Sequence, residues 1–84
     1  MVHKYDANIK PNDIQEGVRD EYGCIYSSDW KRLLKTDGSL ETYTVRDGTE
    51  VVCNEAFKDC VSLHTVVPPN TVVVVGLWAF EECN

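Results

Sequence analysis

A short motif that occurs twice limits the folds open to this chain: Ala-Phe, two charged residues, then Cys. The first copy is Ala56, Phe57 and Cys60, and the second, 23 positions later, is Ala79, Phe80 and Cys83. The same offset aligns Tyr43 with Val66 and Val51-Val52 with Val74-Val75, and a turn sequence precedes each valine pair. A fixed order of features at a period of roughly 20 to 50 residues is typical of repeat architectures. The sequence therefore predicts two adjacent copies of one structural unit.

Each unit is predicted to supply a short strand and a return segment, with like positions stacked on one another. The residues expected to point inward are Leu40, Tyr43 and Val45 in the first unit, and Leu63 and Val66 in the second. Within the motif, Ala lets the return segment approach closely, and Phe fills the space between units. Cys ends the turn as a small inward group whose S–H can donate weakly to a carbonyl. A structural role is thus predicted for all six motif residues.

The order of residues resembles the BspA-like leucine-rich repeats, whose unit reads approximately L-x-x-I-x-I-P-x-x-V-x-x-I-G-x-x-A-F-x-x-C. The second unit, residues 63–84, fits best, at Leu63, Val66, Pro69, Val72, Val75, Gly76, Ala79, Phe80 and Cys83. The first unit, residues 40–62, departs from the pattern at Arg46 and Cys53, where the family has Pro and Gly.

Residues 22–36 resemble the β-hairpin that often interrupts these arrays. Trp30 stands where that hairpin normally has Gly, so its turn is expected to differ. Residues 1–21 fall outside the resemblance. The resemblance implies one domain, 1–84, that is mainly β: a short leucine-rich-repeat-type solenoid of strand plus short helical turn units with an N-terminal β-hairpin. Proteins with these repeats are known chiefly as surface and adhesion proteins of host-associated bacteria, which implies a non-catalytic protein–protein interaction module, adhesion-related in role.

Alternation and turn chemistry place the individual elements. Strands are expected within residues 23–27 and 32–35 of the hairpin, in 41–45 and 64–67, and in 50–52 and 72–75. Turns are expected at Asp37-Gly38 and Asp47-Gly48. A further strand is predicted over Tyr5–Ile9, and one helical turn over residues 11–18, capped by Asn12 or Asp13.

Size and charge exclude several classes of function. The chain has 84 residues, enough for one small domain, and a net charge of −6 with no basic cluster, which argues against a nucleic-acid partner. No apolar run is long enough for a transmembrane helix, so no membrane insertion is expected. The amino terminus also lacks the apolar run of a secretory signal. The expectation is a cytoplasmic protein as written, or a cell-surface or secreted one if a signal has been removed.

The four cysteines allow three interpretations: disulfides, zinc ligands, or buried free thiols. Cys24, Cys53, Cys60 and Cys83 contain no close C-x(2 to 4)-C pair, so zinc is disfavoured, and the strand pattern is more regular than that of most disulfide scaffolds. Buried free thiols are favoured.

No catalytic motif is found, so no enzyme activity, cofactor or metal is expected. The alternative function is a small thiol-dependent or metal-binding protein that uses Cys with His3 or His64.

Two surfaces are predicted to carry interactions. The first is the outward side of the repeat strands, the presumed concave face, where a protein partner would meet Thr42, Thr44, His64, Thr65 and Val67, with Tyr22 or Tyr26 contributing an aromatic ring. The acidic pairs Asp20-Glu21 and Glu81-Glu82 are interpreted as solvated faces. The second surface is the apolar edge of the last unit, which predicts self-association about a two-fold axis, either by direct contact of two chains or by exchange of strands between them. Its contact residues are expected to be Val72 to Val75, Leu77, Trp78 and Phe80.

Overall fold

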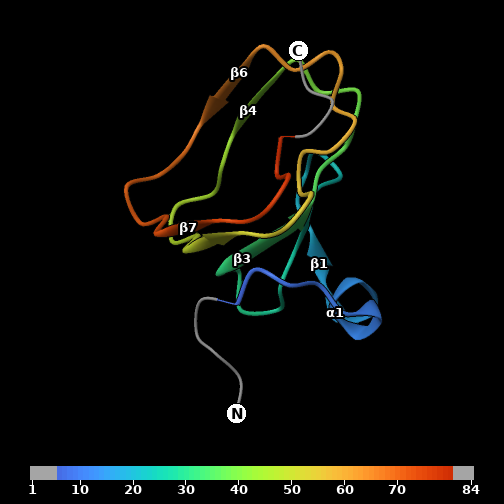
Figure 1. Cartoon of the computed structure of the whole chain (residues 1–84), viewed down its shortest axis with the longest axis vertical. Helices are drawn as coiled ribbons and strands as arrows, with labels where there is room; N and C mark the ends of the chain where they lie inside the picture. Colours follow the sequence, from blue (N-terminus) through green and yellow to red (C-terminus); the bar gives the residue numbers. More distant parts are fainter. Residues whose placement is uncertain (1–5, 81–84) are drawn as a thin grey trace.

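A computed structural model describes residues 6–80 of the chain. Its elements are α1 (Pro11–Glu16), β1 (Val18–Arg19), β2 (Ile25–Tyr26), β3 (Arg32–Lys35), β4 (Thr42–Thr44), β5 (Val51–Val52), β6 (Thr65–Val67) and β7 (Val74–Val75). The Cα radius of gyration is 11.6 Å, close to the roughly 12 Å expected of a compact domain of this length. The predicted mainly β class is confirmed: strands and turns dominate, and α1 is a short helix at one end of the molecule (Figure 1).

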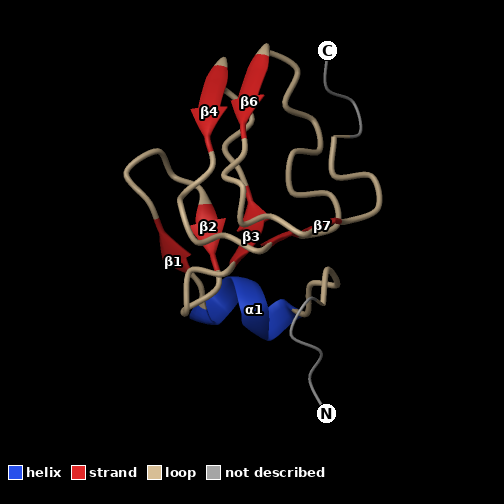
Figure 2. Cartoon of the chain, turned by 90° about the vertical axis from the view of Figure 1, so that its left-hand side faces the viewer, coloured by secondary structure: helices blue, strands red, loops and turns tan. Residues whose placement is uncertain are grey.

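The larger sheet has five strands in the order β1-β2-β3-β5-β7. The first three pair antiparallel, with Tyr26 opposite Leu33 in the β2/β3 hairpin, so the hairpin predicted over residues 22–36 is present. From β3 onward the pairing is parallel, first to β5 and then to β7. Figure 2 shows α1 lying below this sheet, beneath β2 and β3. Strands are therefore found in all six stretches where alternation predicted them.

The 23-residue period is the register of both parallel pairs that join the two units. Val51 lies opposite Val74 in β5/β7, and Thr42 lies opposite Thr65 in the separate two-stranded sheet β4/β6. The backbone repeats as well, because Glu55 and Trp78 both have a positive φ, 60° and 54°. Two repeated units are fewer than the three or more that a stable solenoid usually needs, so the solenoid assignment stays a prediction.

The core consists of two apolar clusters that lie on the two faces of the larger sheet. Adjacent residues of each strand alternate between them, since Leu33 belongs to the first cluster and Leu34 to the second. The first cluster contains Phe57 and the alanines of both motifs, Ala56 and Ala79, all of them buried. The Ala-Phe segments form tight turns, as expected, and neither is helical over the residues that the structure describes. Cys83 lies outside the described residues.

The N-terminal segment is held by Arg32 of β3. Its guanidinium donates to the carbonyls of Asp6 (2.9 Å) and Asn8 (2.5 Å) and lies 3.6 Å from the carboxylate of Asp13. The described part of the strand expected over Tyr5–Ile9 has no strand structure, and Tyr5 lies outside the described residues. The Ala7 carbonyl, between those of Asp6 and Asn8, accepts the Asn54 amide at 2.8 Å, so three successive carbonyls of this segment are bonded without a strand ladder.

The predicted helical turn exists as α1, but its cap was assigned wrongly. Lys10, and not Asn12 or Asp13, is the N-cap. Asp13 occupies the third helical position, and its carboxylate accepts a hydrogen bond from the Lys10 amide at 2.8 Å. Pro11 follows the cap, where its fixed φ and missing N–H suit a helix start.

Trp30 closes the β2/β3 hairpin with φ of +64°, in the left-handed region that favours glycine. Its amide donates to the Ser27 carbonyl at 2.8 Å. The indole packs on the ring of Tyr26, with centroids 5.4 Å apart, and the Arg46 guanidinium lies 4.2 Å above it. These contacts offset the backbone strain of placing a bulky side chain at such a position.

Candidate functional site

The two-stranded sheet β4/β6 presents an uncharged, exposed face. Thr42 and Thr44 of β4 lie directly beside Thr65 and Val67 of β6, and all four side chains are exposed. Tyr43 is buried and Val66 half-buried against the core. This is the alternation that a half-buried strand produces. We call these four residues, together with His64, the outer face.

His64 lies at the start of the outer face. It comes one residue before β6, is exposed, and its amide donates to the Glu41 carbonyl at 2.7 Å. At the other end, the Val45 amide donates to the Val67 carbonyl at 2.9 Å, so both ends of the sheet are fixed. The structure therefore brings four of the five predicted face residues together in register, and His64 is exposed at the adjoining chain position. Hydroxyl and methyl groups on a short sheet whose ends are fixed by hydrogen bonds can form hydrogen bonds and apolar contacts with a partner surface.

The two tyrosines expected on this face do not contribute to it. Tyr26 is completely buried in the first core cluster, so its assignment to a binding surface was wrong. Tyr22 is exposed, but its ring packs edge-on against Tyr43, with centroids 5.9 Å apart. Tyr43 projects from the opposite side of β4, and Tyr22 therefore lies near the inner side of the sheet. The outer face has no aromatic residue among the described positions of β4 and β6.

Beneath the outer face runs a directional chain of hydrogen bonds. The Arg46 amide donates to the Tyr26 hydroxyl (3.1 Å), the two tyrosine hydroxyls lie 2.6 Å apart, and the Tyr43 hydroxyl donates to the Asp20 carboxylate at 2.5 Å. Since Tyr43 donates to Asp20, Tyr26 is the donor between the tyrosines. Burial raises the pKa of Tyr43, and its bonds to Asp20 and Tyr26 raise it further. Burial also raises the pKa of Tyr26.

Asp20 is thus a structural acceptor, which corrects its interpretation as part of a solvated face. Its other oxygen accepts the amides of Tyr22 (2.8 Å) and Cys24 (2.9 Å), closing the loop before β2. A half-buried carboxylate with three donors is a satisfied one. Charge patterning could not reveal this role, because the decisive donor, Tyr43, is 23 residues away along the chain.

The thiols within the described residues are free and buried, as favoured from the sequence: Cys24, Cys53 and Cys60. Burial raises the pKa of the Cys24 thiol and raises that of Cys53 to about 11, which opposes formation of the nucleophilic thiolate. Cys60 Sγ lies 3.2 Å from the Thr36 hydroxyl and donates weakly to the Lys58 carbonyl at 3.9 Å. Over residues 6–80, no three His, Cys, Asp or Glu side chains gather as a metal site would require.

The second unit exposes apolar side chains along its outer edge. Val72 and Val74 are half-buried and pack against the core clusters, so the exposed apolar surface near β7 comes from Val73 and Val75 instead. Leu77, Trp78 and Phe80 extend this surface, and all of them are exposed. Val72 and Val74, which were expected at a self-association contact, therefore face the core, and the homodimer stays a prediction.

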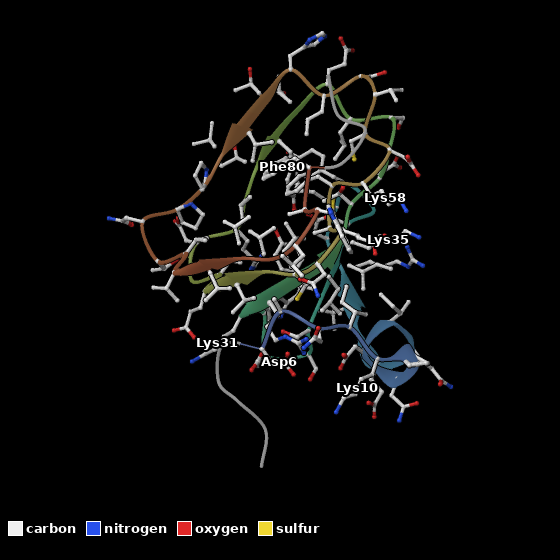
Figure 3. All side chains as sticks on the ribbon, viewed as in Figure 1. Asp6, Lys10, Lys31, Lys35, Lys58 and Phe80 are labelled. Carbon is white, nitrogen blue, oxygen red and sulfur yellow. The ribbon has the colours of Figure 1, made fainter. Side chains whose placement is uncertain are left out.

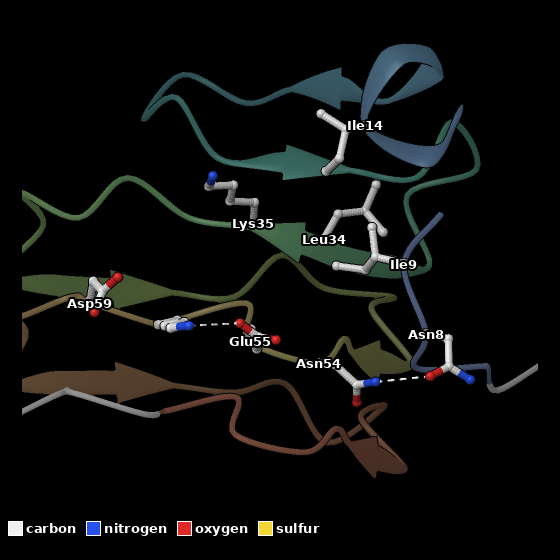
Figure 4. A pocket seen from close by; sticks show the side chains of 9 residues that line it. Asn8, Ile9, Ile14, Leu34, Lys35, Asn54, Glu55 and Asp59 are labelled. Carbon is white, nitrogen blue, oxygen red and sulfur yellow. Dashed lines mark hydrogen bonds and ion pairs between the residues drawn. The ribbon is translucent and has the colours of Figure 1, made fainter. Parts of the chain in front are cut away.

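A cleft of about 440 Å³ opens on a different side, between β3 and the N-terminal segment. Ile9, Ile14 and Leu34 form its apolar part, and Asn54 bonds across its rim to Asn8 at 3.0 Å (Figure 4). Lys35 and Lys58, which also line it, project from the same side of the molecule (Figure 3). Sequence reasoning missed this cleft because it depends on the docking of residues 6–16, which carry no repeat signal.

Comparison of the chain with protein-family models, with curated proteins and with solved structures found no match. None of the helices in residues 6–80 has the length and apolar character needed to span a bilayer.

Proposed function

We propose that this chain is a non-catalytic protein-interaction module that binds a partner protein through the outer face of β4/β6. The observation that carries the proposal is the arrangement of Thr42, Thr44, Thr65 and Val67, which stand in register on two paired strands and are all exposed. The layer beneath them is fixed by the bonded Tyr43 and Tyr26 hydroxyls. A pre-organised face loses little conformational freedom on binding, which favours affinity.

The scaffold proposed for this face is a short solenoid of the BspA-like leucine-rich-repeat type. Its support is the 23-residue register of β4/β6 and β5/β7, and the matching backbone at Glu55 and Trp78. The motif alanines, Ala56 and Ala79, are both buried. An adhesion-related role rests on the resemblance alone. The thiol-dependent alternative draws no support from Cys24 and Cys53, whose buried thiols have raised pKa values.

The test is partner capture from native lysate by the intact protein and by variants of the outer face. Thr65→Arg places a long cation on the face at an exposed position and is expected to abolish capture while the fold is retained. Ser28→Arg is the matched control, because it introduces the same residue at an exposed site in the hairpin turn. Capture that survives Thr65→Arg, or that is lost equally in Ser28→Arg, contradicts the proposal.

Thiol labelling of the folded protein separates this function from the alternative. Slow reaction of Cys24, Cys53 and Cys60 until denaturant is added is expected, because these three thiols are buried. One thiol that reacts rapidly at neutral pH would favour the thiol-dependent function instead.

A further inference from the structure

The outer edge of the second unit forms a second apolar surface, here called the end surface: Val73, Val75, Leu77, Trp78 and Phe80. Two of its residues, Val75 and Phe80, are exposed at positions where the first unit is buried. Val75 is 57 % exposed, whereas Val52, its counterpart 23 residues earlier, is 3 % exposed. Phe80 is 44 % exposed and its counterpart Phe57 is 0 % exposed. The second unit covers the first, and no described residue covers the second in the same way.

The backbone groups of the two units differ in the same way: those of the first unit are bonded to the second. In the first unit, the Val52 carbonyl accepts the Gly76 amide (2.7 Å), and the amides of Glu55 and Phe57 donate to the second unit at 3.0 and 2.6 Å. The corresponding groups one unit later are the Val75 carbonyl and the Trp78 and Phe80 amides. Over residues 6–80 they lie at the edge of the sheet, since β7 is its last strand. An edge strand with such groups is a template for pairing with another strand.

Charge indicates what can approach this edge. Residues 61–80 contain no Asp, Glu, Lys or Arg, so the net charge of −6 comes from the rest of the chain. Two copies of an acidic protein repel one another least where they meet through an uncharged segment. The acids that follow in the sequence, Glu81 and Glu82, lie outside the described residues.

The opposite edge of the sheet does not match the end surface. It is formed by β1, where Arg19 is exposed and Val18 is half-buried against the core. A head-to-tail contact would therefore set an apolar edge against a short strand that carries a cation. Contact between identical end surfaces avoids this mismatch, and a two-fold axis closes the assembly at two chains.

We propose that two copies of this chain form a dimer through their end surfaces, with β7 antiparallel to the partner's β7 across a two-fold axis. Strands related by a two-fold axis perpendicular to the sheet must run antiparallel, which permits a continuous ladder across the dimer. Trp78, exposed beside Leu77, is the aromatic anchor of the contact. This dimer leaves the outer face of β4/β6 free for a partner.

The experiment is sedimentation velocity of the full chain over a dilution series from millimolar to micromolar. A reversible shift from twice the chain mass of 9.5 kDa to the chain mass is expected on dilution. Val75→Lys puts a charge on the edge strand and is expected to weaken the dimer at least about tenfold. Trp78→Asn is a second variant, because Asn tolerates the positive φ at this position. It should weaken the dimer as well.

Val67→Lys is the matched control. It makes the same substitution at a valine of the same unit that is 51 % exposed, but on the outer face, and should leave the dimer unchanged. A wild-type chain that stays monomeric at millimolar concentration overturns the proposal. A dimer that Val67→Lys weakens as much as Val75→Lys and Trp78→Asn also overturns it. Because Val67→Lys should abolish partner capture while Val75→Lys preserves it, failure of the dimer is distinguishable from failure of the proposed function.

Discussion

The rings of Phe57 and Phe80 stack with centroids 4.8 Å apart and planes inclined by only 6°. They are the same residue of the repeated motif, one in each unit, so the second copy packs directly on the first. Their backbones are coupled as well, through the bond from the Phe57 amide to the Ala79 carbonyl. The motif is therefore repeated for packing between units, which is the role expected of it from the sequence.

The two phenylalanines should differ in their contribution to stability. Phe57→Ala is expected to lower the free energy of unfolding by about 3 to 5 kcal/mol, because Phe57 is fully buried. Phe80→Ala should cost only about 1 kcal/mol, since one face of its ring is exposed. Urea denaturation of both variants at a concentration where the wild type is monomeric measures the difference. Equal losses of stability would contradict the arrangement in which the second unit covers Phe57 and leaves Phe80 partly exposed.

Two buried threonines provide a matched test of hydrogen bonding. The Thr49 hydroxyl is buried and has no hydrogen-bond partner among residues 6–80, so Thr49→Val should raise the free energy of unfolding by about 1 kcal/mol. The Thr36 hydroxyl donates to the Ala56 carbonyl at 2.8 Å, so Thr36→Val should lower the free energy by about 1 to 2 kcal/mol. Thermal and urea unfolding of both variants test this. Changes of the same sign would contradict the assigned bonding.

The backbone at Glu55 predicts that glycine is tolerated there. With φ of 60°, Glu55→Gly relieves strain and should leave the free energy of unfolding equal or raise it by up to about 1 kcal/mol. The ion pair lost with Lys58, at 3.2 Å, is exposed and contributes little. Glu41→Gly is the control at an exposed position, and it should lower the free energy by about 0.5 to 1 kcal/mol. A larger loss of stability in Glu55→Gly than in Glu41→Gly would contradict a positive φ at Glu55.

Stability should decrease in alkaline solution. Burial raises the pKa of the Cys53 thiol from 9.0 to about 11, even though the Arg32 guanidinium nearby favours the thiolate. A raised folded-state pKa gives stability that is complete below pH 9 and is lost as the pH rises toward 11. The raised pKa values of Tyr26 and Tyr43 add a further loss above pH 10.

The free energy of unfolding measured at pH 7, 9 and 11 tests this dependence. Cys53→Ala should reduce the slope between pH 9 and 11 without changing it between pH 7 and 9, whatever its effect on the absolute stability. An unchanged slope above pH 9 would show that the Cys53 thiol is solvated in the folded protein.

Local sequence pattern predicted much of this fold, because a strand with one buried side shows alternating apolar and polar residues. Tyr43 is buried between exposed Thr42 and Thr44, as expected, and the 23-residue offset of the sequence equals the register of β4/β6. The short helix was also predictable from Pro11, although its cap was not. Lys10 is not a typical capping residue, and the carboxylate of Asp13 performs that role from within the helix.

The parts that could not be predicted depend on contacts between distant segments. Tyr26 resembles an exposed hairpin residue in the sequence. Its hydroxyl bonds to that of Tyr43, and this bond offsets the cost of burying the polar group. Arg32 bonds to the carbonyls of Asp6 and Asn8 and so holds the segment that lines the cleft beside β3. Neither alternation nor the repeat encodes these two contacts, which join residues 17 and 26 positions apart.

Amide hydrogen exchange of the full chain, alone and with the captured partner protein, tests the central claim that the outer face of β4/β6 is the binding site. The account predicts slower exchange on binding in peptides that cover residues 41–45 and 64–67, with no change in residues 8–16 beside the cleft. Protection confined to the cleft, or absent from β4 and β6 in a complex that persists during labelling, would contradict it.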